Sequence, residues 1–137
     1  SVSATVARVR NIAKEYDLPE RYILYVGDIN WNKNIVGLIK AFSSIVDDKT
    51  QLVLVGKAFA SKSNTPESIA INEAISASPK KSFIKIVGFV PTHHLSAIYR
   101  GATLYVQPSW YEGFGFPLIE ALIQGAPVLS SKQCSLP

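Results

Sequence analysis

The chain has 137 residues, a formal net charge of +4 and a single cysteine, Cys134. This length fits one domain with a substantial core, no run approaches the 18 apolar residues of a membrane-spanning helix, and one cysteine excludes an internal disulfide. The lysines are scattered, without a basic stripe of interleaved aromatics, which argues against nucleic acid, and no Cys/His cluster resembles a metal site. We therefore expect a soluble protein of a reducing compartment, the cytoplasm.

The predicted elements alternate between strand and helix along the chain. Residues 1–20 are predicted to form a lead-in helix (5–15) and a linker, and residues 21–137 the main domain. Apolar, β-branched segments predict five buried parallel strands, at residues 22–26, 51–55, 83–87, 103–107 and 127–130. Apolar spacing and capping residues predict helices between them, at residues 34–47, 66–77 (cap Thr65), 93–101 (cap Thr92) and 117–124.

This alternation predicts an α/β fold, a Rossmann-like doubly wound parallel sheet with right-handed crossovers. Ligands of such sheets bind at the carboxyl ends of the strands, where the strand order reverses, and Gly27, Gly56 and Gly88 follow three of the predicted strands there. The dinucleotide fingerprint GxGxxG is absent, because Gly27 is followed by Asp28-Ile29-Asn30 and so lacks the second glycine. Since a helix usually closes the last strand of this fold, we expect the sequence to be truncated at its C-terminal side and to belong to a longer protein.

The fourth predicted strand leads into the segment SWYEGFGFPLIE, residues 109–120, which places two glutamates eight positions apart. Glu112 precedes the helix that Pro117 is predicted to start, and Glu120 lies in its first turns. Gly113 and Gly115 allow close backbone approach to a ligand, and a helix N-terminus favours an anion. The segment therefore predicts a ligand that carries both sugar hydroxyls and phosphate.

These residues resemble the retaining glycosyltransferases of the GT-B fold, group 1 or family 4. The matching segments are YILYVG (22–27), NKN (32–34), LVLVGK (52–57), VGFV (87–90), VQPSWYEGFGFPLIEA (106–121) and GAPVLSS (125–131). Such enzymes pair two Rossmann-like domains across a cleft, the C-terminal one binding a nucleotide-sugar donor and the N-terminal one mainly the acceptor. The resemblance implies that this chain is most of a donor-binding domain. The expected reaction is transfer of a hexose, such as mannose, from a UDP-, GDP- or ADP-sugar to a glycan, a lipid-linked saccharide or a similar acceptor, with retention of configuration.

The resemblance also implies roles for individual residues. Glu112 would contact the transferred sugar and stabilise developing positive charge, and Lys33 would neutralise the diphosphate leaving group; these two are the expected catalytic residues. Glu120 would bind the ribose hydroxyls. The other expected donor-binding residues are Gly27 beside the diphosphate, Phe89 and Val90 bordering the base, and Gly113, Phe114 and Gly115 along the sugar and diphosphate.

The chain departs from the family at Asp28, where many members carry an arginine directly after the glycine of the first strand. The second cation must then come from elsewhere, and Lys57 is the candidate. No acidic DxD-type pair is present, so we expect a metal-independent enzyme without a cofactor. Peripheral membrane association of the full-length enzyme would suit a lipid-linked acceptor, and we expect the isolated chain not to turn over.

Two other functions are alternatives to the donor-binding domain of a glycosyltransferase. One is a non-catalytic nucleotide-sugar-binding module, or an epimerase on the same fold. The other is a glycoside hydrolase that uses Glu112 and Glu120, which geometry disfavours: eight helical residues rise about 12 Å, whereas hydrolase carboxyl groups lie about 5–9.5 Å apart. His93 and His94 follow a capping residue and are expected to be surface or first-turn residues.

Overall fold

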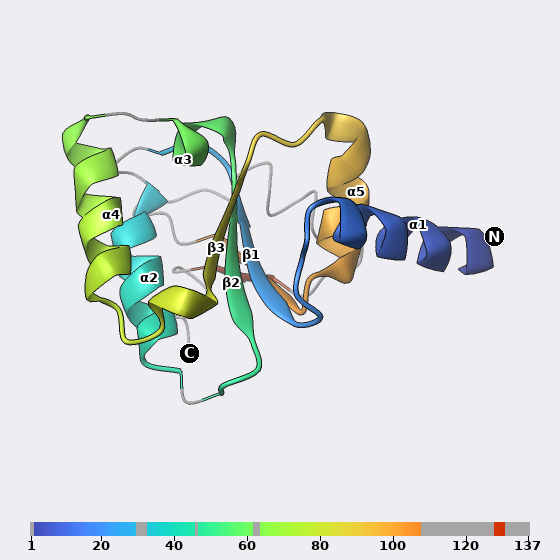
Figure 1. The fold of residues 1–137 in the computed structure, drawn as a ribbon, viewed down its shortest axis with the longest axis horizontal. Helices are drawn as coiled ribbons and strands as arrows, with labels where there is room; N and C mark the ends of the chain where they lie inside the picture. The colour runs from blue at the N-terminus through green and yellow to red at the C-terminus, as the bar shows by residue number, and fades with distance from the viewer. Residues whose placement is uncertain (1, 30–32, 46, 62–63, 108–127, 131–137) are drawn as a thin grey trace.

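Five short apolar segments form one parallel sheet, which Figure 1 shows nearly edge-on. The computed structural model describes residues 2–29, 33–45, 47–61, 64–107 and 128–130. The strand order is β3-β2-β1-β4-β5. The strands are β1 (Tyr22–Val26), β2 (Gln51–Val55), β3 (Ile84–Gly88), β4 (Leu104–Gln107) and β5 (Val128–Ser130). The first strand is central, with Tyr22 opposite Gln51 of β2 and Ile23 opposite Leu104 of β4.

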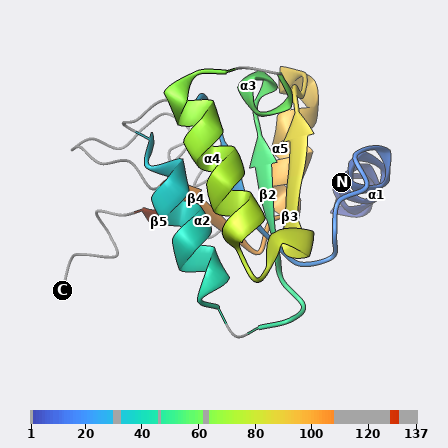
Figure 2. The ribbon, with the colours of Figure 1, turned by 60° about the vertical axis from the view of Figure 1, so that its left-hand side comes forward.

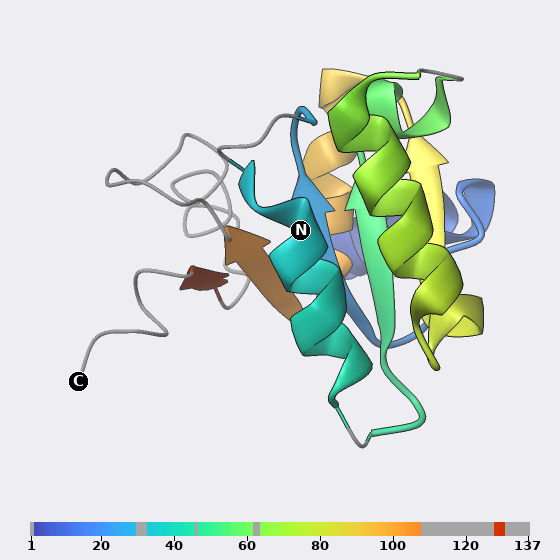
Figure 3. The ribbon, with the colours of Figure 1, turned by 90° about the vertical axis from the view of Figure 1, so that its left-hand side faces the viewer.

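Helices cover both faces of the sheet (Figures 2 and 3). One face carries α1 (Val2–Glu15) and α5 (Thr92–Gly101), and the other carries α2 (Ile35–Ser43) and α4 (Pro66–Ala77). A short helix, α3 (Lys57–Ala60), follows β2, and a 3₁₀ turn, η2 (Lys81–Phe83), precedes β3. In the part of the chain that the structure describes, no helix has the length and apolar character needed to cross a bilayer.

The core has two halves because both faces of each central strand are buried. Toward α1 and α5, the buried residues are Ile12, Tyr22, Leu24, Val53, Val55, Val90, Ala97, Ile98, Tyr99, Ala102 and Tyr105. Toward α2 and α4, they are Ile23, Tyr25, Ile35, Leu38, Ile39, Phe42, Leu52, Leu54, Ile71 and Val106. Burial on both faces explains why the strands read as continuous apolar runs rather than alternating ones.

The structure confirms the predicted fold class, and several predicted bounds agree with it. Both β1 and β2 have the predicted residues, and so does α4. The Thr65 hydroxyl accepts a hydrogen bond from the Ser68 amide at 3.2 Å, which is the predicted cap of α4. Ile98 and Tyr99 of α5 are buried in the core.

Other predicted bounds were wrong. The helix predicted over residues 34–47 ends at Ser43, and Asn34 precedes it in the left-handed conformation at φ 49°. Residue 83 belongs to η2 rather than to β3, β4 begins at Leu104, and β5 begins at Val128. The lead-in helix starts at Val2, since nothing in residues 2–4 breaks it, and α5 starts at Thr92 with Pro91 as its cap. The predicted helix over residues 117–124 lies outside the described residues.

Candidate functional site at the carboxyl edge of the sheet

The strand order places the candidate site between β1 and β4. The chain leaves β1 toward α2 on one face of the sheet, whereas β3 is followed by α5 on the other. In a doubly wound sheet, the crevice for a ligand lies at the carboxyl ends of the strands where the order reverses, which here is the β1–β4 pair. The loop after β1 begins with Gly27, and the segment that follows Gln107 of β4 carries Glu112 and Glu120 in the sequence.

The predicted residues of that second segment lie outside the described residues. They are Glu112, Gly113, Phe114, Gly115 and Glu120, all within residues 108–127. The described part of the candidate site therefore comprises Gly27, Lys33, Lys57, Phe89 and Val90, together with Asp28.

Three glycines line this edge of the sheet with backbone conformations that side chains disfavour. The φ angles are 156° at Gly27, 153° at Gly56 and 81° at Gly88. The Gly27 amide donates to the Val55 carbonyl at 3.0 Å, and the Gly56 amide donates to the Gly88 carbonyl at 2.8 Å. A Cβ atom on Gly56 would collide with the Gly27 carbonyl oxygen. The three strand ends are thus joined backbone to backbone, with no side chain at these three positions.

A buried tyrosine fixes the loop after β1. The Tyr25 side chain is fully buried, and its hydroxyl donates to the Asp28 carbonyl at 2.9 Å. Its ring packs edge to face against Phe59 of α3, with centroids 5.9 Å apart. Burial, and secondly the charge of Asp28, raise the pKa of Tyr25, so the hydroxyl remains a donor at neutral pH. Sequence reasoning assigned Tyr25 to the core, and only the structure shows that it also holds Asp28.

The two predicted cations both lie beyond strand ends of this edge. Lys33 is half-buried directly before α2, and Lys57 is exposed at the start of α3. The sequence placed Lys57 in a loop; the short helix was missed because four residues are too few for a periodic pattern. Within the described residues, neither lysine forms an ion pair, and Asp28 is exposed and forms none. Among the described residues, this edge thus carries two lysines and one aspartate that form no ion pair.

Phe89 and Val90 differ in how far they are exposed to solvent. Val90 is 7% exposed and packs in the core half beneath α5. Phe89 is 66% exposed, far more than any other large apolar side chain in the described part of the chain. The buried Val90 side chain anchors the main chain next to Phe89. The exposed Phe89 ring is therefore suited to packing against a planar group.

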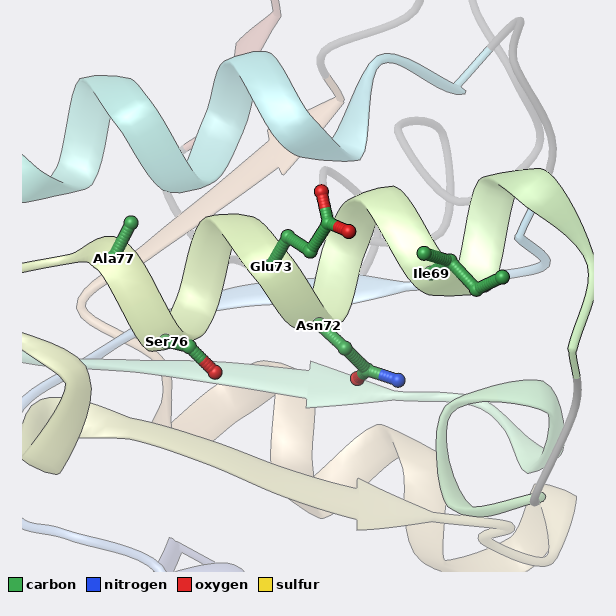
Figure 4. Close-up of a pocket in the computed structure, with 5 residues that line it drawn as sticks. All are labelled: Ile69, Asn72, Glu73, Ser76 and Ala77. Atoms are coloured by element: carbon green, nitrogen blue, oxygen red, sulfur yellow. The ribbon is translucent and has the colours of Figure 1, made fainter.

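Hollows elsewhere on the surface involve none of the predicted residues. One, of about 480 Å³, is lined by residues of α4 alone: Ile69, Asn72, Glu73, Ser76 and Ala77 (Figure 4). Another, of about 530 Å³, lies along the C-terminal half of α1 and includes Arg10 and Lys14. Each is built from a single helix or its end, and neither includes the glycines that follow β1, β2 and β3.

Comparison with known proteins identifies the family. The model of the family described as "Glycosyl transferases group 1" matches residues 9–137. The chain belongs to the group 1 glycosyl transferases. It corresponds to the C-terminal domain of their GT-B fold, as the resemblance of its sequence segments implied.

Relatives of this group 1 domain include characterised transferases. It is 30% identical over 128 residues to the O-antigen chain mannosyltransferase B of Escherichia coli, an alignment that covers 92% of this chain and 32% of the relative. Sucrose-phosphate synthase from Thermosynechococcus elongatus is similar in structure, with a TM-score of 0.74 and 31% identity over 88% of this chain and 30% of that one. HepE of Anabaena, solved in complex with UDP, has a TM-score of 0.77 at 17% identity, over 90% of this chain and 33% of that one. The chain therefore spans about a third of the length of these proteins.

Proposed function

We propose that this chain is the donor-binding domain of a retaining glycosyltransferase that moves a hexose from a nucleoside-diphosphate sugar to a saccharide or lipid-linked acceptor. The observation that carries the proposal is the strand order: it makes β1 and β4 neighbours, and thereby brings the Gly27–Asp28 loop to the strand end that leads to Glu112 and Glu120. The similarity to a mannosyltransferase supports mannose as the hexose. The likeness to a fold solved with UDP supports a nucleotide donor.

Each end of the donor has a group suited to it. Breaking the bond between the anomeric carbon and the diphosphate oxygen leaves negative charge on the diphosphate, which Lys33, with Lys57 as the second cation, would neutralise. Glu112 would stabilise positive charge on the sugar as the acceptor hydroxyl forms its bond to the anomeric carbon and gives its proton to the departing diphosphate oxygen. Glu120 would accept hydrogen bonds from the ribose, and the main chain at Phe89 and Val90 would border the base.

The proposal includes metal independence and a cytoplasmic location. Two lysines beside a bare backbone edge provide the positive charge that a divalent ion supplies in other transferases. The single cysteine is in keeping with a reducing compartment. Since the acceptor half of a GT-B enzyme lies in its other domain, the chain alone would bind the donor without transferring the sugar.

Calorimetric titration of the chain with UDP, GDP and ADP, with and without magnesium, tests the proposal. We expect one of the three to bind, with an affinity that does not depend on magnesium and that falls at least tenfold in Glu120→Ala. Glu73→Ala, which removes a carboxylate from the outer face of α4, is the matched control and should bind as the unaltered chain does. A folded chain that binds none of the three would contradict the proposal.

A further inference from the structure

The lead-in helix is fastened to the first turn of α5 by side chains that the proposed function does not use. The Tyr16 hydroxyl lies 2.6 Å from Nδ1 of His94, and the two rings meet edge to face with centroids 5.6 Å apart. The Arg8 guanidinium donates to the His93 carbonyl. Arg8 lies within α1 and Tyr16 directly follows its last residue, about two helical turns further on, so two separate points hold the same turn of α5. We call this set, Arg8, Tyr16, His93 and His94, the α1–α5 latch.

The latch acts on the turn that directly follows the predicted base-bordering loop. Gly88 ends β3, and α5 begins at Thr92, so only Phe89, Val90 and Pro91 lie between them. The His94 amide donates to the Pro91 carbonyl at 2.9 Å, which ties the latched turn to the end of the loop. A shift of His94 would therefore move Pro91 and the residues before it.

The N-terminal end of this loop, at Gly88, is fixed by contacts with the sheet. The Gly88 carbonyl accepts the Gly56 amide at 2.8 Å, and the Val90 side chain packs in the core half that also contains Ile12 of α1. With both ends and its middle residue fixed, the loop has one free side chain, the exposed Phe89. Helix α1, far from Phe89 in sequence, is thus one of the elements that determine where Phe89 lies.

The chemistry of the latch suits a fixed contact. Partial burial, and secondly the charge of Glu15, raise the pKa of Tyr16, so its hydroxyl keeps its proton at neutral pH and can donate it to Nδ1 of His94 where that nitrogen carries no hydrogen. A carboxylate oxygen of Glu15 lies 3.6 Å from the same nitrogen, within ion-pair distance. Nδ1 of His94 therefore lies beside two polar groups at the end of α1.

We propose that Tyr16 and His94 are positioning residues for nucleotide recognition: the α1–α5 latch holds the Phe89–Val90 main chain in the place where the base binds. The inference rests on the proposed function and adds to it residues that touch no ligand. Holding a binding loop in its bound position strengthens binding because less freedom is lost when the ligand arrives.

Variants of the latch separate positioning from mere stabilisation. Tyr16→Phe removes the hydroxyl and keeps the ring, His94→Leu removes the nitrogen, and His94→Asn restores an acceptor near the position of Nδ1. Tyr22→Phe is the matched control, because the Tyr22 hydroxyl bonds to the same helix, at 2.6 Å from the Ile98 carbonyl, but away from the latched turn.

Two readouts on the whole chain test the inference: hydrogen exchange at the Phe89 and Val90 amides, and affinity for UDP, GDP, ADP and inorganic pyrophosphate. We expect Tyr16→Phe and His94→Leu to speed exchange at both amides and to weaken binding of the preferred nucleotide by about three- to tenfold, with pyrophosphate unchanged. His94→Asn should restore most of the affinity. Tyr22→Phe should lower the melting temperature and leave both readouts unchanged.

The outcomes distinguish the two proposals. If the unaltered chain binds a nucleoside diphosphate and Tyr16→Phe binds it equally well, only the positioning inference is overturned. The same conclusion follows if Tyr22→Phe weakens binding as much as Tyr16→Phe does. If the unaltered chain binds no nucleoside diphosphate, the donor-binding proposal fails and the inference fails with it.

Discussion

The amino ends and the carboxyl ends of the parallel strands, here called the amino edge and the carboxyl edge of the sheet, are built from different kinds of contact. At the amino edge, side chains join the loops: Thr50 donates to Asp47 at 2.7 Å, and Arg21 donates to Thr50 at 3.3 Å. Lys80 donates to the Ile45 and Asp47 carbonyls just beyond α2. At the carboxyl edge, glycine backbones are joined directly and the described lysines are left without ion pairs.

The difference indicates which edge stabilises the fold and which one serves a ligand. Polar groups at the amino edge find their partners within the chain, and their contacts contribute to the free energy of folding. At the carboxyl edge, three glycines adopt positive φ angles, and within the described residues Lys33 and Lys57 form no ion pair, which is in keeping with a binding site. Substitutions at the two edges should therefore separate stability from affinity.

The largest expected effect is on the free energy of unfolding, and it comes from a substitution at Gly56. Gly56→Ala places a Cβ against the Gly27 carbonyl in a conformation that alanine disfavours, and we expect it to lower the free energy of unfolding by about 3 kcal/mol. Urea denaturation measures this loss. Gly37→Ala, within α2, displaces only the Asn34 side chain and should be neutral or stabilising. Equal midpoints for Gly56→Ala and the unaltered chain would show that this edge is not tightly packed.

Lys33 should affect affinity without affecting stability. Lys33→Met removes a cation that no described residue pairs, so we expect binding of the nucleoside diphosphate to weaken about tenfold, while stability changes by less than about 0.5 kcal/mol. Titration calorimetry and thermal melting measure the two quantities. Lys40→Met, at an exposed position of α2, serves as the control. Undiminished affinity in Lys33→Met would remove Lys33 from the site.

Lys80 should show the reverse behaviour. Lys80→Met loses hydrogen bonds of 3.2 and 2.7 Å to two carbonyls and a cation placed 4.3 Å from the centre of the Phe42 ring. We expect a loss of about 1–2 kcal/mol in unfolding free energy and unchanged nucleotide affinity. Lys81→Met, an exposed neighbour, should change neither. Weakened binding in Lys80→Met would mean that the two edges are coupled.

The smallest expected effect is a pH dependence at the amino edge. Hydrogen bonds from the Lys49 amide, and then from the Thr50 hydroxyl, hold the pKa of Asp47 below its ordinary value of 3.8. Because the pKa of Asp47 is lower in the folded state, its ionised carboxylate stabilises the fold fully above pH 3.8. This stabilisation is lost as the pH falls through the pKa that Asp47 has in the folded state. Asp47→Asn should thus melt below the unaltered chain at pH 6, and the difference should shrink below pH 4. A constant difference in melting temperature across this range would contradict the assignment.

Most of the fold could be predicted from the sequence because local signals and tertiary packing agree. The apolar runs of β1 and β2 and the Thr65-Pro66 start of α4 give their bounds directly. The end of α2 could not be predicted from the sequence, because apolar residues continue at helical spacing to Ile45. In the structure, the Ile45 carbonyl lies beyond the helix and accepts a hydrogen bond from Lys80, 35 residues away. The pairing of Tyr16 with His94 is likewise a long-range contact with no local signal.

The candidate site was predictable in position but only partly in detail. The glycines after β1, β2 and β3 marked the carboxyl edge, since glycine after a buried strand indicates a special backbone conformation. Phe89 and Val90 looked equivalent in the sequence, and only the packing of Val90 under α5 shows that one of them is anchored and the other exposed. The roles of Glu112 and Glu120 stay predictions.

Mapping a bound nucleotide onto the chain by amide chemical shifts tests the difference between the two edges most directly. On addition of the nucleoside diphosphate that binds best, we predict that the largest shifts fall at Gly27, Gly56 and the residues around Phe89, while Thr50 and Lys80 do not change. Shifts concentrated at the amino edge, or along α4 around Glu73, would contradict the assignment of the carboxyl edge as the binding site.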